Sequence, residues 1–154
     1  MIQIYKLSAL LYRLHIPVLP KLLYLMNRVL FSLVLPATVK VGHRVTFAYQ
    51  GIGTVVHARA VIGDDVYIGP QVIIGGRSGE VAVPVIESGA FIGAGARVLG
   101  PVVVGRGARV AAGALVLHDV PPGVTVAGIP AKAIHSSRIQ PDLDLMGGAR
   151  NAFR

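Results

Sequence analysis

The chain contains no cysteine among its 154 residues, which excludes disulfide bonds, thiolate nucleophiles and metal sites built on cysteine. Its longest apolar stretch, residues 29–35, is much shorter than the ~20 residues that span a bilayer. A secretory signal is not indicated either, because Lys6 and Arg13 bracket the first apolar run and no small-residue cleavage site follows. These absences predict a cytoplasmic protein.

Charged residues are also scarce, at 14% of the chain against 53% hydrophobic residues, so a large interior or a subunit interface must be buried. An aliphatic residue returns at every sixth position over much of the sequence. One run consists of Val56, Ile62, Ile68 and Ile74, and a second consists of Ile86, Ile92, Val98, Val104, Val110 and Val116. The gap from Ile74 to Ile86 is a multiple of six, so both runs share one register.

This period is typical of hexapeptide repeats. One hexad cannot shield its aliphatic side chain, whereas stacked coils bury all of them in one continuous interior. An α-helix does not explain the period, since six residues rotate through about 600° and successive repeats would point in different directions. A β-sandwich would show strands at a wider spacing of about 8 to 12 residues. We therefore predict an all-β solenoid, a parallel β-helix.

Residues 1–36 break the period and show helical spacing instead. Apolar positions recur at Ile4, Leu7, Leu11 and Leu14 before Pro17 and Pro20, and again at Leu22, Met26, Leu30 and Leu33 before Pro36. Two short amphipathic helices are predicted. They either pack on the solenoid or on neighbouring subunits, which is the commoner arrangement, or lie on anionic lipid through the cations that punctuate them. The predicted segments are helices at 1–36, the repeat domain at 37–134 and a C-terminal tail at 135–154.

The formal net charge is +8, with fifteen Lys and Arg against seven Asp and Glu, and it calls for an anionic partner. Nucleic acid is not expected, because the chain has neither a dense Lys/Arg cluster nor aromatic residues interleaved with the repeat. A phosphorylated small molecule fits better. Cations of the repeat region that could surround its phosphates are Arg77, Arg97, Arg106, Arg109 and Lys132, although most of them could equally be solvated turn residues.

Four stretches carry a resemblance to a known family. They are IGGR at residues 74–77, FIGAGARVLG at 91–100, DVPPG at 119–123 and AGIPAK at 127–132. Over about residues 38 to 134 the chain resembles the hexapeptide acyltransferases, and within them the serine acetyltransferase branch. This resemblance implies a left-handed β-helix of triangular section, a homotrimer with active sites between subunits, and acetyl-coenzyme A as the donor.

The chain departs from that branch at three positions. The resemblance places the catalytic histidine at Gln50, a second active-site histidine at Val83 and the partner aspartate at Val34. The stretch YQGIGTVVH at residues 49–57 instead resembles acetyltransferases of bacterial surface-polysaccharide clusters. We therefore predict an acetyl-coenzyme A-dependent O-acetyltransferase that acts on a saccharide hydroxyl. Serine O-acetylation, sugar N-acetylation and a non-catalytic trimeric scaffold are the alternatives.

Direct transfer of an acetyl group to a hydroxyl needs a general base, which histidine can be near neutral pH. His57 is the first candidate, because it occupies a turn position that normally takes a small residue; the alternative is an outward turn histidine without a catalytic role. His43 and Tyr49 are next. His15 and His135 lie outside the repeat, and His118 stands where the family usually has lysine. A γ-type carbonic anhydrase would need three histidines around zinc, and the repeats hold no such cluster, so no metal site is expected.

The remaining site residues are expected on the donor and acceptor sides of this base. A backbone N–H in the Gly75–Gly76 turn could stabilise the oxyanion, because glycine permits close approach. Coenzyme A is expected along one edge formed by small residues and a cation, Gly76, Ala94, Ala112 and Arg109, with Gly75, Arg77 and Lys132 nearby. Tyr49 and Gln50 are expected on the acceptor side.

Overall fold

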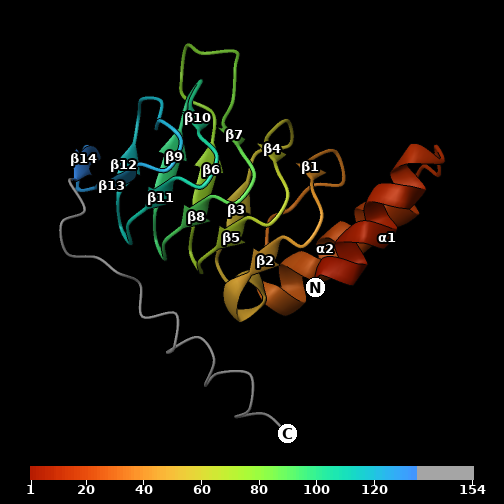
Figure 1. Ribbon diagram of the computed structural model, residues 1–154. Coiled ribbons are helices and arrows are strands. Elements are labelled where there is room, and N and C mark those ends of the chain that lie inside the picture. The colour runs from red at the N-terminus through yellow and green to blue at the C-terminus, as the bar shows by residue number, and fades with distance from the viewer. Residues whose placement is uncertain (135–154) are drawn as a thin grey trace, which may run out of the picture.

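Three sheets enclose one aliphatic column in the computed structural model, which describes residues 1–134 (Figure 1). The first face contains β1 (Lys40–Val41), β4 (Val61–Ile62), β7 (Val85–Ile86) and β10 (Val103–Val104). The second face contains β2 (Thr46–Phe47), β5 (Tyr67–Ile68), β8 (Phe91–Ile92), β11 (Arg109–Val110), β13 (Thr125–Ala127) and β14 (Lys132–Ile134). The third face contains β3 (Val55–Val56), β6 (Ile73–Gly75), β9 (Arg97–Leu99) and β12 (Leu115–Val116).

From β1 to β12, consecutive strands lie on consecutive faces, so each coil of the chain turns three corners. We name these corners 1/2, 2/3 and 3/1 after the faces they join. All strand pairs are parallel except β13 with β14, which close the last coil as an antiparallel hairpin. The predicted parallel β-helix is confirmed. The predicted C-terminal tail, residues 135–154, lies outside the described residues, and His135 lies with it.

The every-sixth aliphatic residues form the interior. From Val56 to Val116 each member of the two runs is at most 2% exposed. Aliphatic residues on the same face of successive coils stack directly on one another. Val98, for example, pairs with Ile74 in one neighbouring coil and with Val116 in the other. Each rung therefore covers the apolar side chain of the rung below it.

A second buried row fills the corners. It lies two residues before each aliphatic position and contains Ala60, Val66, Val72, Ala90, Ala96, Val102, Ala108 and Ala114. Most of its members are alanine or valine, because a corner leaves less room than a face. This row was not predicted from the six-residue period alone.

Two helices precede the first coil, as predicted. Helix α1 (Ile2–Arg13) and helix α2 (Leu19–Phe31) pack against each other as a hairpin beside the N-terminal end of the solenoid (Figure 1). Pro20 does not interrupt α2 but lies in its first turn, where proline's missing N–H has no helical partner to lose. In the described part of the chain, neither helix is long and apolar enough to cross a membrane.

The hairpin is tied to the solenoid by a buried phenol. The Tyr5 hydroxyl donates to the Val39 carbonyl at 2.6 Å, and burial raises the pKa of Tyr5. Within the hairpin, the Ser8 hydroxyl donates to the Pro20 carbonyl at 3.0 Å. After α2 the chain enters the third face, where Val34 forms a bridge with Val55.

Burial of the aliphatic column leads to a prediction about the stability of the fold. Val104→Asp should lower the free energy of unfolding by on the order of 3 to 5 kcal/mol, because the carboxylate would replace a side chain that is 0% exposed. Thermal denaturation should show a melting temperature about 10 °C lower. Val103→Asp is the matched control, since the neighbouring valine points outward and is 38% exposed. If the two variants melted alike, the register described here would be wrong.

Candidate active site

His57 lies at corner 3/1, directly after β3, and its side chain is half-buried. Its imidazole faces Gly76 in the next coil. A Cβ atom added to Gly76 would lie 3.8 Å from Cδ2 and 3.9 Å from Nε2 of the ring. The structure thus brings together two residues that the sequence analysis assigned to one site.

One hydrogen bond selects the tautomer of the neutral His57 ring. The Arg59 backbone N–H donates to Nδ1 of His57 at 3.2 Å. A neutral imidazole carries a single proton, so Nδ1 accepts and the proton lies on Nε2. In the described state His57 therefore offers an N–H donor, rather than a lone pair, to the side of Gly76.

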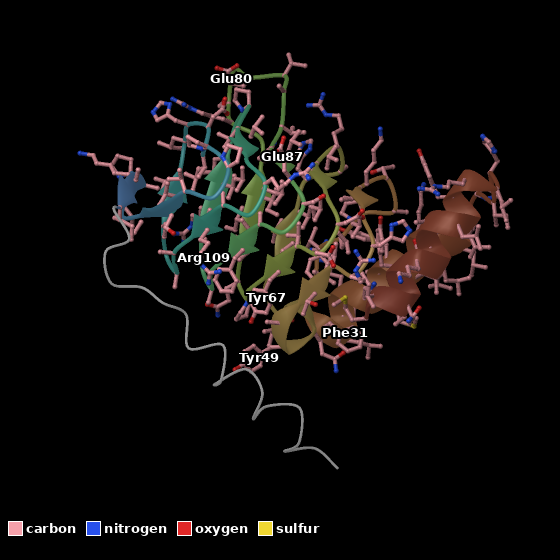
Figure 2. All side chains as sticks on the ribbon, in the orientation of Figure 1. Phe31, Tyr49, Tyr67, Glu80, Glu87 and Arg109 are labelled. Atoms are coloured by element: carbon pink, nitrogen blue, oxygen red, sulfur yellow. The ribbon has the colours of Figure 1, made fainter. Side chains whose placement is uncertain are left out.

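Arg59 also holds the inserted loop that begins at Gly76. Its guanidinium donates to the Val81 carbonyl at 2.6 Å, across the inserted loop of residues 76–84. That loop reaches the tip labelled Glu80 in Figure 2, and it brings Cγ1 of Val83 within 3.9 Å of the Cβ position of Gly76. The sequence analysis missed Arg59. Its place two residues after His57, in the turn below the insertion, is the signal that could have found it.

Gly75 and Arg77 belong to the same corner. Gly75 ends β6, and its carbonyl accepts the Gly100 N–H at 3.0 Å. The Arg77 side chain packs over Gly100, where an added Cβ would lie 3.3 Å from Cβ of Arg77. Corner 3/1 therefore gathers four of the expected residues, His57, Gly75, Gly76 and Arg77.

Another set lies at corner 2/3. Tyr49 and Gln50 form the short 3-10 turn η1 (Ala48–Gly51), both with left-handed φ values, and Tyr49 is 79% exposed. Ala94 and Ala112 stack in later coils of this corner, where the Gly113 N–H donates to the Ala94 carbonyl at 2.8 Å. Lys132 begins β14 and pairs with Ala127, next to the same corner.

Arg109 lies on the second face, away from both corners. Its Cζ is 4.5 Å from the ring centroid of Phe91, and Phe91 stacks on Tyr67 with centroids 4.7 Å apart and planes 3° apart. Figure 2 labels Arg109 and Tyr67 on this face. A cation over an aromatic face is stabilised electrostatically, so the stack holds this guanidinium in place.

The expectation that Gly76, Ala94, Ala112 and Arg109 share one edge is wrong for a single subunit. Three hexads return the chain to the same corner, and Gly76 and Ala94 are separated by that many residues. The loop of residues 76–84, however, adds one hexad of chain without advancing to the next face. Ala94 therefore lies one corner away from Gly76.

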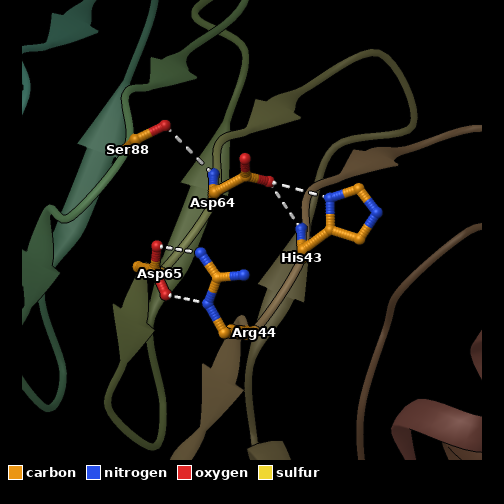
Figure 3. A network of polar contacts seen from close by, with 5 residues as sticks. All are labelled: His43, Arg44, Asp64, Asp65 and Ser88. Atoms are coloured by element: carbon orange, nitrogen blue, oxygen red, sulfur yellow. Dashed lines mark hydrogen bonds and ion pairs between the residues drawn. The ribbon is translucent and has the colours of Figure 1, made fainter.

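His43, the second candidate for the base, lies at corner 1/2 (Figure 3). Its backbone N–H donates to Oδ1 of Asp64 at 2.6 Å, and its Nδ1 lies 3.3 Å from the same oxygen. The backbone hydrogen bond from His43 is the main cause that lowers the pKa of Asp64. The His43 side chain is 87% exposed, so neither a wall nor a covering loop would exclude water from it.

The neighbouring ion pair, Arg44 with Asp65, lies at the same corner. Arg44 donates to both carboxylate oxygens of Asp65 at 2.6 Å, which lowers the pKa of Asp65 and raises that of Arg44 (Figure 3). The Ser88 hydroxyl accepts the Asp64 N–H at 3.2 Å. These contacts link successive coils at an exposed corner. Within residues 1–134, no group of three or more His, Asp and Glu side chains could hold a metal ion.

Comparison with known proteins shows what this fold and these motifs are similar to. Residues 84–118 match the family model described as bacterial transferase hexapeptide (six repeats). Serine acetyltransferase of Synechococcus elongatus is 34% identical over 134 residues, covering 86% of this chain and 54% of that protein. Serine acetyltransferase of Escherichia coli K12 is 39% identical over 116 residues, covering 73% of this chain and 42% of that protein.

Solved structures similar to this chain are also serine acetyltransferases. Serine acetyltransferase of Brucella abortus in complex with coenzyme A superposes with a TM-score of 0.82 at 34% identity, covering 86% of this chain and 54% of that one. Soybean serine acetyltransferase complexed with serine gives a TM-score of 0.80 at 36% identity, covering 86% of this chain and 55% of that one. The chain spans about half the length of the relatives it matches.

These relatives overturn two expectations from the sequence. Proteins 34% to 39% identical to this chain are serine acetyltransferases, and neither a saccharide acceptor nor the surface-polysaccharide branch is supported. The prediction of a saccharide acceptor was wrong because it relied on the short stretch at residues 49–57. The similarity to serine acetyltransferases extends over most of the chain. The alternative of serine O-acetylation fits better than the saccharide prediction.

Proposed function

We propose that this chain, which belongs to the hexapeptide-repeat transferase family, transfers an acetyl group from acetyl-coenzyme A to the hydroxyl of serine. The observation that carries the proposal is its similarity to serine acetyltransferases across the solenoid, together with a histidine that faces the Gly76 turn. Acetyl-coenzyme A is the co-substrate, and no metal is required. Because that donor is an intracellular metabolite, we place the reaction in the cytoplasm.

The active site is completed by two subunits of a homotrimer in this proposal. One subunit contributes corner 3/1 with His57 and Gly76, and its neighbour contributes corner 2/3 with Ala94, Ala112 and Lys132. The separation of these residues within one chain supports this arrangement. Small side chains at Ala94 and Ala112 would let the pantetheine arm approach the backbone, and Lys132 would bind a phosphate of coenzyme A.

The acceptor must be bound differently from the pattern of the serine acetyltransferase branch. The three positions that carry catalytic residues in that pattern are Val34, Gln50 and Val83 here. Val34 lies beside Val55, and Val83 lies against Gly76, so both form apolar walls. We assign the serine carboxylate to Arg77, an exposed cation on the corner that carries His57.

His57 acts as the general base. It removes the serine hydroxyl proton while the oxygen attacks the thioester carbonyl, and a backbone N–H of the Gly75–Gly76 turn stabilises the oxyanion. The carbon–sulfur bond then breaks, and the coenzyme A thiolate takes the proton from the imidazolium. For Nε2 to accept a proton, Nδ1 must carry one, so binding of the acceptor must break the bond between Nδ1 and the Arg59 amide.

The base role predicts the kinetics of three variants. His57→Ala and His57→Asn should each lower kcat by about 10²- to 10⁴-fold, because neither side chain can take up a proton. His57→Gln should be equally slow, although its amide can still donate an N–H near the position of Nε2. The measurement is release of the coenzyme A thiol from acetyl-coenzyme A in the presence of serine.

Two results would contradict this assignment. Near wild-type turnover in His57→Ala would move the base elsewhere, with His43 and Tyr49 the next candidates. Selective recovery of activity in His57→Gln would make His57 an N–H donor to the oxyanion, which is the role that its described tautomer fits. Circular dichroism should show that all three variants keep the fold.

Donor binding can be tested without any acceptor. Titration calorimetry should show that the wild-type chain binds coenzyme A and that Lys132→Gln weakens binding by about fivefold, because one contact between opposite charges is lost. Lys40→Gln is the matched control, since Lys40 is also exposed but lies on the first face. No affinity for coenzyme A or acetyl-coenzyme A would remove the acetyltransferase proposal and favour a trimeric scaffold without catalysis.

A further inference from the structure

The helical hairpin is a cationic element without a single carboxylate. The first acidic residue of the chain is Asp64, well inside the solenoid. Helix α1 carries Lys6 and Arg13, and helix α2 carries Lys21 and Arg28. Each pair is separated by seven residues, which places both cations on one side of their helix.

Aliphatic side chains line the exposed surface next to these cations. Five of them are at least 58% exposed, and they are Leu14, Val18, Leu22, Val29 and Leu30. Leu22 and Val29 are again seven residues apart, so they form a stripe that borders the side of Lys21 and Arg28. A helix with an apolar stripe flanked by cations is typical of peptides that lie in a membrane interface.

A cavity of about 660 Å³ lies between the end of the hairpin and the first turn of corner 3/1. Its lining includes Arg13, His15 and Lys21 of the hairpin segment, together with Tyr12, Tyr24 and Thr38. The volume is that of a small-ligand site, and the wall combines cations with apolar surface. An anionic group attached to an apolar body matches both properties.

We propose that the hairpin docks on a membrane surface that contains anionic phospholipid, with one headgroup phosphate in this cavity and the aliphatic stripe in the interface. A second copy of the hairpin is a poorer occupant, because it would bring two sets of cations together with no carboxylate between them. The lipid phosphate supplies the missing negative charge, and the acyl region accepts the exposed leucines and valines.

The docked surface lies beside the corner that carries His57. The Thr38 hydroxyl, on the cavity wall, donates to the Ala58 carbonyl at 2.7 Å, and Ala58 directly follows His57. Docking would therefore hold corner 3/1 close to the membrane. Membrane docking is independent of the proposed transfer reaction, because it involves the hairpin and the cavity beside it, uses none of the residues assigned to catalysis, and is tested by binding.

Sedimentation with vesicles tests the proposal on the full chain. The chain should bind vesicles of phosphatidylcholine that contain about a third phosphatidylglycerol and should not bind vesicles of phosphatidylcholine alone. Inorganic phosphate at the same phosphate concentration should not displace it, because free phosphate offers nothing to the aliphatic stripe. Displacement by inorganic phosphate would identify the cavity as a site for soluble anions and overturn the membrane proposal.

Matched variants separate the two contributions. Lys21→Gln should weaken vesicle binding by about fivefold, whereas Arg97→Gln, an exposed cation on the third face, should leave it unchanged. Val29→Gln should weaken binding as well, whereas Val81→Gln should not. Val29 and Val81 are 73% and 78% exposed, so both changes alter surface alone and should preserve the melting temperature.

Three further results would overturn the inference. Equal binding to neutral and anionic vesicles would remove the role of the cations, and equal binding by Val29→Gln and Val81→Gln would remove the role of the stripe. The third is absence of vesicle binding together with a smaller oligomer for Val29→Gln in analytical ultracentrifugation. That outcome would assign the hairpin to contacts between subunits.

Discussion

The structure depends on one constraint, the burial of an aliphatic side chain at every sixth residue. Each rung covers the apolar side chain of the rung below, so a shift of one residue would turn the whole interior outward. Because that register is fixed, so is the corner at which each turn residue lies. His57 faces Gly76 for this reason, and Ala94 is stacked with Ala112.

The same constraint explains how much of the fold could be predicted. The period of Val and Ile residues identified the solenoid and its core, and helical spacing identified the two helices before it. The small residues that fill the corners, such as Ala60 and Ala96, recur with the same period of six, but the prediction followed the larger aliphatic residues and left this row out. The site was harder, because one inserted hexad moves Ala94 away from Gly76 and a single backbone N–H sets the tautomer of His57. Neither the insertion's effect on the corners nor the hydrogen bond can be read from residue types.

Two features of the described chain are incomplete by themselves. Corner 3/1 holds a histidine beside a glycine turn but lacks the stacked alanines and the lysine expected to bind the donor, which lie at corner 2/3. The hairpin exposes aliphatic residues and cations without any acid to pair with them. A neighbouring subunit would complete the first feature and an anionic lipid surface the second. The solenoid positions both, since its rigid coils place the hairpin next to the turn that follows β3.

Complementation between two inactive variants tests most directly whether the active site is completed by two subunits. His57→Ala removes the base at corner 3/1, and Ala112→Trp blocks the donor at corner 2/3. Equal amounts of the two chains, unfolded together and refolded into trimers, should regain about a quarter of the wild-type rate, because random assortment pairs an intact corner 3/1 with an intact corner 2/3 at that frequency. Mixed trimers that form but remain as inactive as either variant would show that each site belongs to one chain, and would contradict the account.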